Sequence, residues 1–521
     1  MIDPQEHIKK IEEIISSALK YSEEISQTGE FFDAGEFLFS ISTMVEEISY
    51  YESLKLYERI ISLWGNQIDK YRMLGKWHEI SELHLRISEI YAEKFKDYKR
   101  EKKHILRCIR FLRQECKIME EFNEGRKLAQ NYQNIAELYL KISNFGKAIK
   151  YYEKVIKYAK ILNFYDLLSY SYRQISFSYE ELDDYRLSQE ILLEAIDYFT
   201  DLFQAFEKKN ENLALSQLSQ ILKNIYKDLD NEKQYVNYSK KEAGAYINIA
   251  EELVKKKKNY YKIARYYRGA ALCYKSIENN LIESASCFVL AGNYSEKMDD
   301  FNQTGINYFD AAKMFKKLNN PDMAYKHFMK AGDNFWKIKE HSKSTESYLY
   351  AYDIAMEAKL EFNRFGLFNQ IVRGLNIIAK EGLKNKQFYT AATLILESVK
   401  FYEQLDTAKD FLLREMIKNT YKYYYRAANL KKIGYSHIVH SYIVAALSLI
   451  LIGQCDKAKE IVSEIKSNGE TVNLLKSLIT TLIKWVSEGK KVELDKLPFK
   501  MRRIVERSED IKYLLELFKR I

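Results

Sequence analysis

Residues 132–160, YQNIAELYLKISNFGKAIKYYEKVIKYAK, decide the fold of this 521-residue chain. Four of them recur at helical spacing and share one face of a first helix: Tyr132, Ile135, Ala136 and Tyr139. The turn 144–146 follows, and a second helix then places Ala148, Tyr152 and Val155 on one face. The two alanines allow the helices to approach closely, and the larger side chains fill the space around them. The stretch therefore predicts a helical hairpin.

The same pattern returns forty residues later, so the hairpin is a repeat. The second copy has these residues at the equivalent positions: Tyr172, Ile175, Ser176, Tyr179, Ser188, Leu192 and Ala195. Related patterns occur at 87–91, 249–253 and 391–402, and 31–64 is interpreted as a degenerate or capping hairpin. One hairpin cannot bury its apolar face alone, so such repeats must stack. The hairpins resemble tetratricopeptide repeats, and the resemblance implies a right-handed α-solenoid.

The middle of the chain has a shorter repeat of one helix and one turn. Pairs of small residues mark its copies: Ala270-Ala271, Ala291-Gly292, Ala311-Ala312, Ala331-Gly332 and, less closely, Ala351-Tyr352. Tyr274, Phe315 and Phe335 each follow such a pair by one helical turn, so small and aromatic residues share a face. The pattern predicts successive helices that interlock, and Asn320-Pro321 predicts the start of one of them. We therefore assign the aromatic residues to core packing rather than to a platform that stacks ligands or bases.

Two passages in this middle region resemble the soluble NSF attachment proteins, or SNAPs. Residues 287–294, CFVLAGNY, are similar to that family's alanine-glycine helix, and 316–324, KKLNNPDMA, are similar to the passage before its next repeat. Farther along, three segments resemble in order the helices of the family's C-terminal bundle: 441–465, 474–478 and 510–521. The resemblance runs from residue 240 to residue 521, and it leaves an additional repeat array before it.

The resemblance implies an adaptor role in vesicle trafficking. SNAPs lay a basic helical sheet along a four-helix SNARE bundle and present their C-terminal end to a hexameric AAA ATPase. Two departures limit what carries over. Residues 255–261, KKKKNYY, stand where the family has an apolar, Phe-rich membrane loop, and 518–521, FKRI, stand where it has an acidic tail with a leucine. We therefore expect neither membrane insertion nor stimulation of an ATPase from the resemblance.

Composition supports a folded, helical chain. Its 3 prolines and 18 glycines are too few to punctuate a sandwich or barrel, and 47% hydrophobic with 30% charged residues argue against disorder. The apolar run 442–452 is shorter than the roughly 20 residues that span a bilayer and is interpreted as a buried helix. Asp3-Pro4 is typical of a helix start rather than of a secretory leader. We expect a cytoplasmic protein that is peripheral to membranes through its partners.

The sequence offers no motif for catalysis. It contains no Gly-rich phosphate loop, HExxH, GxSxG or dinucleotide fingerprint, so we predict a non-enzyme without cofactor or metal. His437 and His440 are three residues apart, but no further ligand completes a metal site, and His78 and His84 are not on adjacent turns. The five cysteines form no CxxC pair and are predicted to be buried free thiols in a reducing compartment: Cys108, Cys116, Cys273, Cys287 and Cys455.

Two basic clusters are the candidate partner-binding residues: Lys255, Lys256, Lys257 and Lys258 in the first, and Lys500, Arg502 and Arg503 in the second. If both line one concave face, they would attract an acidic helical bundle or coiled coil. The alternative is that each is a solvated turn or helix face. The net charge of +9 is a mild excess, and without a nucleic-acid motif or a dedicated basic stripe we do not expect nucleic acid as a partner.

The sequence as a whole predicts an all-α chain of stacked helical hairpins in three parts. These are a tetratricopeptide-like array at 1–235, a SNAP-like repeat region at 236–430 and a helical bundle at 431–521. The predicted function is a non-enzymatic adaptor between a SNARE-like helical bundle and a AAA ATPase. One alternative is a generic repeat scaffold for assembly or signalling complexes, with scattered basic residues. Another is a ligand- or peptide-responsive regulator with a deep, aromatic-lined central pocket.

Overall fold

The computed structural model describes residues 4–122, 124–257, 259–404, 410–429, 434–466, 469–490 and 497–518. Within these ranges every regular element is a helix, which confirms the predicted all-α, tetratricopeptide-like fold. The chain divides into two compact units, Met1–Tyr238 (unit 1) and Ser239–Ile521 (unit 2). Each unit contains hydrophobic clusters of its own.

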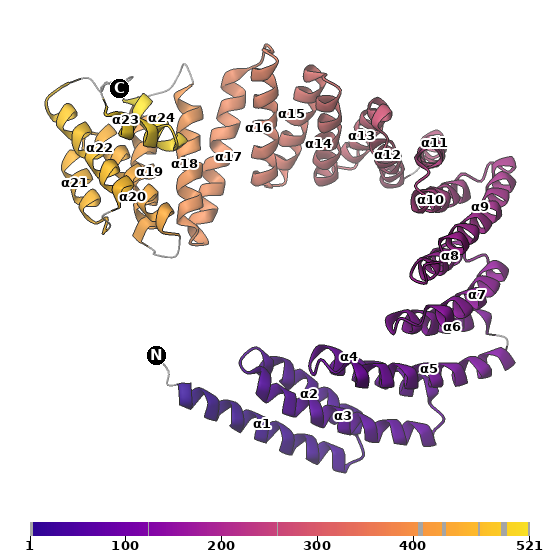
Figure 1. The fold of residues 1–521 in the computed structure, drawn as a ribbon. Coiled ribbons are helices and arrows are strands. Elements are labelled where there is room, and N and C mark those ends of the chain that lie inside the picture. Colours follow the sequence, from indigo (N-terminus) through magenta and orange to yellow (C-terminus); the bar gives the residue numbers. More distant parts are fainter. Residues whose placement is uncertain are drawn as a thin grey trace. The chain divides into compact units, whose positions relative to one another are not determined.

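Unit 1 is a series of helical hairpins in which each helix from α1 to α10 packs against the next (Figure 1). One apolar cluster joins α1 to α5, and a second joins α5 to the start of α11. The helices are α1 (Pro4–Gln27), α2 (Phe31–Glu46), α3 (Tyr50–Met73), α4 (Trp77–Glu93), α5 (Tyr98–Glu121), α6 (Gly125–Lys141), α7 (Phe145–Leu162), α8 (Tyr165–Glu180), α9 (Tyr185–Lys208), α10 (Asn212–Asp228) and α11 (Glu232–Lys255), which continues into unit 2. Asp3, predicted to cap the first helix, lies outside the described residues.

The hairpin predicted to be degenerate or capping consists of α2 and the first part of α3. Its central side chain is Trp64, which is fully buried. Gly35 makes room for it, because a Cβ atom at Gly35 would lie 2.3 Å from Nε1 of Trp64. The absence of a side chain at Gly35 therefore lets α2 approach α3 closely at Trp64.

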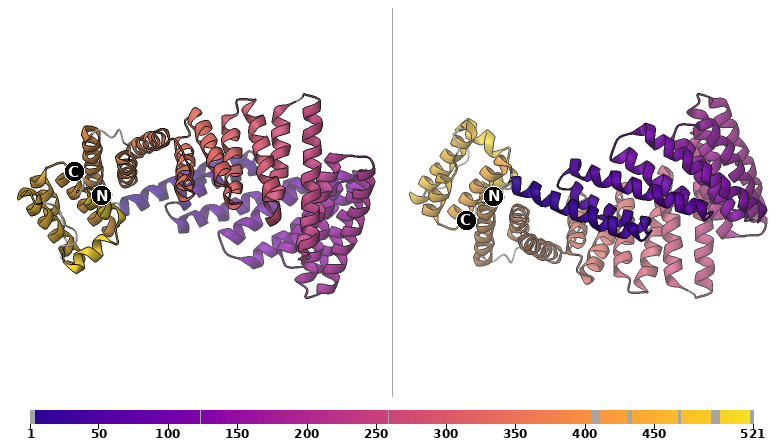
Figure 2. Two further views of the ribbon diagram at one scale, coloured as in Figure 1. Left: turned by 90° about the horizontal axis from the view of Figure 1, so that it is seen from above. Right: turned by 90° about the horizontal axis from the view of Figure 1, so that it is seen from below.

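Unit 2 begins as a row of helices, α12 to α17, that stand side by side, and continues into a bundle (Figures 1 and 2). The row contains α12 (Tyr260–Lys275), a 3₁₀ turn (Glu278–Asn280), α13 (Leu281–Glu296), α14 (Phe301–Lys317), α15 (Pro321–Lys337), α16 (His341–Glu357) and α17 (Arg364–Lys384). The remaining helices are α18 (Phe388–Glu403), α19 (Asp410–Asn429), α20 (Tyr435–Leu451), α21 (Cys455–Ser463), α22 (Glu470–Ser487), α23 (Phe499–Val505) and α24 (Glu509–Leu517).

Glycines and aromatic rings interlock the helices of the row. Gly292 on α13 faces Tyr308 on α14, and a Cβ atom at Gly292 would lie 2.8 Å from the tyrosine ring. Forty residues later, Gly332 on α15 faces Tyr348 on α16, where the corresponding distance is 2.5 Å. Each tyrosine hydroxyl also donates a hydrogen bond to the residue after the glycine, at 2.7 Å in both cases. The same joint therefore recurs once per helical hairpin.

The turns of the row repeat a short capping pattern. Asn319 has a positive φ of 51°, which turns the chain sharply after α14. Asn320 then caps α15, because its Oδ1 accepts a hydrogen bond from the N–H of Met323 at 3.2 Å, and Pro321 takes the first helical position as predicted. Asp300 caps α14 in the same way, through the N–H of Gln303 at 3.0 Å. Such caps fix where each helix begins and keep the repeat regular.

The bundle is built around α20. All residues from 442 to 451 are buried, as predicted for this apolar run, and α20 packs against α19, α21, α22 and α24. An apolar helix surrounded by other helices needs no polar face. Of the helices in the described ranges, none combines the length and the apolar character of a membrane span.

Candidate protein-interaction surfaces

The residues named from the sequence for repeat packing all lie between helices. Twelve of them are buried: Ile135, Ala136, Tyr139, Ala148, Tyr152, Ile175, Ala271, Ala291, Gly292, Ala312, Ala331 and Gly332. Tyr179 is half-buried. These residues shape the array from inside, so the surfaces available to partners consist of other side chains.

The first basic cluster forms the turn between α11 and α12. Lys255, Lys256 and Lys257 are exposed, and Lys258 lies outside the described residues. Lys256 has an ion pair with Glu252 one helical turn earlier, at 3.9 Å. Such an exposed pair contributes little to stability. The lysines therefore form a solvated, positively charged corner.

Aromatic side chains flank this corner. Tyr260 and Tyr261, at the start of α12, are 41% and 57% exposed. Tyr260 lies against Tyr294, with ring centroids 5.9 Å apart, and the Nζ of Lys297 lies 4.6 Å from the Tyr294 centroid. The run of lysines in the sequence predicts only a basic turn here. The structure shows a mixed basic and aromatic surface at this corner.

The second basic cluster lies on α23. Met501 and Val505 are buried and fix the inner side of this short helix, while Arg502 and Arg503 are exposed. Phe499, at its start, is 71% exposed. Lys500 has an ion pair with Glu470 of α22 at 2.8 Å, and both side chains are largely exposed. This pair raises the pKa of the Lys500 ammonium and lowers that of the Glu470 carboxyl.

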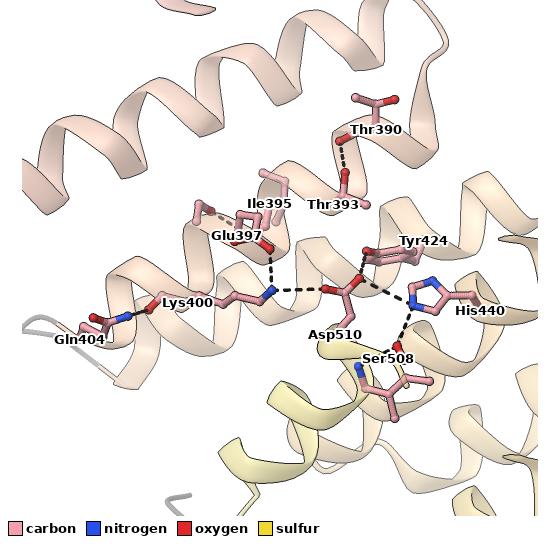
Figure 3. A network of polar contacts seen from close by, with 12 residues as sticks. Thr390, Thr393, Ile395, Glu397, Lys400, Gln404, Tyr424, His440, Ser508 and Asp510 are labelled. Carbon is pink, nitrogen blue, oxygen red and sulfur yellow. Dashed lines mark hydrogen bonds and ion pairs between the residues drawn. The ribbon is translucent and has the colours of Figure 1, made fainter. Parts of the chain in front are cut away.

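A polar network around Asp510 holds α24 on the bundle (Figure 3). The Asp510 carboxylate reaches Nζ of Lys400 on α18 at 3.3 Å and the hydroxyl of Tyr424 on α19 at 3.2 Å. It also lies 3.7 Å from Nε2 of His440 on α20. Ser508 caps α24 by accepting from the N–H of Ile511, and its hydroxyl contacts the same His440 nitrogen at 3.3 Å. One carboxylate thus joins α24 to three helices, and α23 is attached to it by a short turn.

Charge balance in the network explains its protonation states. Burial disfavours the ammonium of Lys400, but the carboxylates of Glu397 and Asp510 outweigh burial and raise its pKa. Burial also raises the pKa of the Tyr424 hydroxyl, and the nearby Asp510 carboxylate adds to this shift. The pKa of His440 is lowered because burial outweighs the attraction of Asp510. The Lys400 ammonium thus pairs directly with the Asp510 carboxylate, and the Tyr424 hydroxyl and His440 lie against the other carboxylate oxygen.

The structure does not bring the two basic clusters together. The α11–α12 turn and α23 lie at opposite ends of unit 2, with the row of helices between them (Figure 1). They are therefore two separate basic surfaces of unit 2.

Further cations along the row were missed by sequence reasoning. Exposed Lys313 on α14 lies with its Nζ 4.4 Å from the ring centroid of Phe309, one turn earlier on the same helix. Lys297, at the end of α13, has the same relation to Tyr294. An aromatic residue three or four positions before a lysine is the signal that could have revealed these pairs. Lys337 lies 4.5 Å from the centroid of an aromatic ring on α14, and spacing along one helix does not reveal such a contact.

The histidines and cysteines named from the sequence do not form a common site. His437 contacts Ser436, whereas His440 belongs to the Asp510 network. His78 lies between Glu82 and Glu115. Within the described ranges no three His, Cys, Asp or Glu side chains gather closely enough to hold a metal ion.

Four of the five cysteines are buried, as predicted, but Cys455 is not. It is the first residue of α21, where the chain enters the helix from a surface turn, and it is half-exposed. Burial raises the pKa of the Cys108 thiol to about 12, with a smaller contribution from the Glu82 carboxylate. A thiol with such a pKa is chemically inert at neutral pH.

Residues 230–366 match the family model "Soluble NSF attachment protein, SNAP". The matched stretch covers α11 to α16 and ends at the start of α17, so it includes the first basic cluster and not the second. Residues 441–521, which resemble the family's C-terminal bundle, lie outside it. None of the curated proteins matches this chain.

Solved structures similar to the chain include BtubC (BKLC) from P. vanneervenii, at 17% identity and a TM-score of 0.19, covering 51% of this chain and 93% of that one. The TPR domain of P58(IPK) has 11% identity and a TM-score of 0.20, covering 69% and 99%. The human IFIT1 dimer with m7Gppp-AAAA has 12% identity and a TM-score of 0.21, covering 79% and 89%. TM-scores this low support no conclusion about function. The chain's own helices show a tetratricopeptide-like repeat protein, and its residues 230–366 match the SNAP model.

Proposed function

We propose that this chain is a non-enzymatic adaptor whose unit 2 binds the side of a helical protein bundle, as SNAPs bind SNARE bundles. The observation that carries the proposal is the SNAP match over 230–366. It coincides with the row of helices that glycine–aromatic joints hold in register. A row of this kind is a stiff surface, and a stiff surface loses little conformational entropy when it binds.

Charge supports an acidic partner. The row carries exposed lysines held over aromatic rings, among them Lys297 and Lys313, and the basic α11–α12 turn stands at one end. A lysine that packs on a ring stays in place with its ammonium toward solvent. Clustered positive charge of this kind raises the rate of association with an acidic partner and makes the rate sensitive to salt.

The C-terminal bundle would present a second surface. The exposed Phe499, Arg502 and Arg503 on α23 are fixed in place through α24 and its Asp510 network. By analogy with SNAPs, this end would face a AAA ATPase, and the protein would act in the cytoplasm and reach membranes through its partners. The proposal covers binding alone.

Binding of the purified full-length chain to a preassembled four-helix SNARE bundle tests the proposal. We would measure fluorescence anisotropy of the labelled bundle between low and moderate salt. Saturable binding that weakens as salt rises is expected, and the triple variant Lys255→Gln, Lys256→Gln, Lys257→Gln should weaken it further. The control removes three exposed charges from unit 1: Lys102→Gln, Lys117→Gln and Lys150→Gln.

Each outcome is decisive for one part of the proposal. No saturable binding at low salt would overturn the SNAP-like function and favour a scaffold for another complex. Equal weakening by the control would show that overall charge, and not the α11–α12 corner, attracts the bundle. If a AAA ATPase binds the chain on the SNARE bundle, and the double variant Arg502→Gln, Arg503→Gln no longer binds it, the role of α23 is supported.

A further inference from the structure

A surface cavity of about 530 Å³ lies in unit 1 between α3, α4 and α5, outside the stretch that matches the SNAP model. Its apolar walls include Ile61, Ile68 and Phe111. Its volume is in the range of cavities that hold small molecules. Nothing in the adaptor proposal uses it.

The cavity has an excess of positive charge. Three arginines line it, Arg72 from α3 and Arg107 and Arg110 from α5, against a single carboxylate, Asp69. Asp69 is already engaged, because its Oδ1 lies 2.7 Å from a guanidinium nitrogen of Arg72. In the part of the chain that the structure describes, neither Arg107 nor Arg110 has an ion pair. Two guanidinium groups therefore remain for an anion, and their planar forks suit phosphate oxygens.

Two histidines form the inner wall. The Nδ1 atoms of His84 and His104 lie 3.2 Å apart, and the His84 ring stacks on Phe111 with 5.6 Å between centroids. Burial lowers the pKa of His84 to about 3, helped by His104, Arg107 and Arg72. The pKa of His104 falls to about 4 through burial, Arg107 and Lys103. Both rings are thus neutral at pH 7, and a hydrogen bond between their Nδ1 atoms leaves one Nε2–H as a donor.

Gly65 leaves one wall of the cavity without a side chain. It lies in the interior of α3 and lines the cavity, yet a Cβ atom there would meet nothing within 4 Å. Packing therefore does not require glycine, in contrast to Gly35, whose Cβ would strike Trp64. The glycine therefore keeps this part of the cavity open, and a larger side chain there would occupy it.

We propose that this cavity binds a small phosphorylated molecule, with its phosphate monoester on Arg107 and Arg110 and its apolar part against Ile61 and Ile68. A phosphate monoester carries about −1.5 to −2 charges near pH 7, which matches the two uncompensated guanidinium groups. A monocarboxylate would neutralise only one of them. Unit 1 would then carry a ligand site in addition to the adaptor surface proposed for unit 2.

Isothermal titration of the full-length chain with phenyl phosphate tests the proposal, with inorganic phosphate and benzoate as comparison probes. Phenyl phosphate should bind most tightly, inorganic phosphate more weakly because it lacks the apolar part, and benzoate least. The double variant Arg107→Gln, Arg110→Gln should weaken phenyl phosphate roughly tenfold or more, since it removes charge-assisted hydrogen bonds. The charge-matched control on the same helix, Lys102→Gln with Lys117→Gln, should bind as the wild type does.

Gly65→Leu separates shape from charge. It retains every charged group, fills the cavity and favours the helix, so circular dichroism and thermal melting should report a folded chain that no longer binds phenyl phosphate. Undiminished binding by Gly65→Leu would overturn the site. Equal losses in the arginine variant and its control would also overturn it, because binding would then depend on overall charge. Benzoate that binds as tightly as phenyl phosphate would overturn the assignment to phosphate.

Discussion

The joint between Gly332 and Tyr348 allows a quantitative test of how the row of helices is held together. In the variant Gly332→Ala, the new Cβ atom would lie 2.5 Å from Cε1 and 2.8 Å from Cδ1 of the tyrosine ring. Both distances are well inside normal van der Waals contact. The ring cannot turn away at low cost, because Tyr348 is 1% exposed and its hydroxyl donates to Asp333 at 2.7 Å.

The magnitude follows from two opposing effects. Overpacking a close-packed core costs about 1–3 kcal/mol. Alanine favours the helix over glycine by about 1 kcal/mol, which offsets part of that cost. Because both contacts are shorter than 3 Å, the overpacking cost should fall in the upper part of its range, at about 2–3 kcal/mol. Gly332→Ala should then destabilise the joint by about 1–2 kcal/mol, which corresponds to roughly a 5- to 30-fold rise in the population of the opened state.

Hydrogen exchange measured by mass spectrometry is the suitable assay. Stacked repeats open locally, so a single melting temperature would average the effect over the whole chain. Amides of α15 and α16 should exchange faster in Gly332→Ala by the factor given above. Gly244→Ala is the matched control: Gly244 lies inside α11, its Cβ would meet nothing within 4 Å, and this variant should gain about 0.5–1 kcal/mol.

Unchanged exchange in α15 and α16 of Gly332→Ala, with Gly244→Ala behaving as described, would refute the reasoning. A double-mutant cycle with Tyr348→Val adds a second test. Once the ring is gone, the Gly332→Ala change should cost much less than it does alone. Additive losses would mean that the two residues do not touch.

Three further predictions follow from the described contacts. Asp510→Asn should loosen α24 by about 1–2 kcal/mol, seen as faster hydrogen exchange there, because the Lys400 ammonium keeps Glu397 but loses the carboxylate that ties it to α24; unchanged protection would contradict the anchoring role. Burial, with Lys330 and Lys326, lowers the pKa of His327 to about 4. The unfolded chain therefore takes up a proton below pH 6.5 and the folded chain only near pH 4, so stability should fall by roughly 3 kcal/mol across this window. In His327→Phe, the free energy of unfolding in urea should fall less between pH 6.5 and pH 4. A loss as large as in the wild type would mean that other groups cause it. A maleimide reagent should label half-exposed Cys455 in minutes and leave Cys108 unreacted in the folded chain, as counted by mass spectrometry.

The repeat could be predicted from the sequence because its signals are local. Small pairs such as Ala331-Gly332 recur at a fixed interval, and Asn320-Pro321 carries the capping chemistry of a helix start. Both depend on residues within one or two helical turns. Spacing along one chain segment is therefore enough to place them on a common face.

The surfaces could not be predicted to the same extent, because they depend on which helices meet. His84 and His104 are 20 residues apart, and only the packing of α4 on α5 makes them partners. Lys400 and Asp510 are separated by 110 residues. Cys455 appeared as one more buried thiol, since nothing local marks the first residue of α21 as half-exposed. Tertiary packing decides these features, and the spacing of residues along the sequence does not reveal which helices pack together.

The glycine–tyrosine joints and the Asp510 network also differ in when they can form on a growing chain. Tyr348 bonds to a residue 15 positions earlier, so each joint of the row can close soon after its second helix leaves the ribosome. The network joins residues 110 positions apart and must await the synthesis of Asp510. Until then α20, which is buried along most of its length in the finished protein, has an incomplete cover. The nascent chain would therefore be vulnerable to aggregation at the bundle rather than in the row, and a chaperone that protects this protein would be needed late in its synthesis.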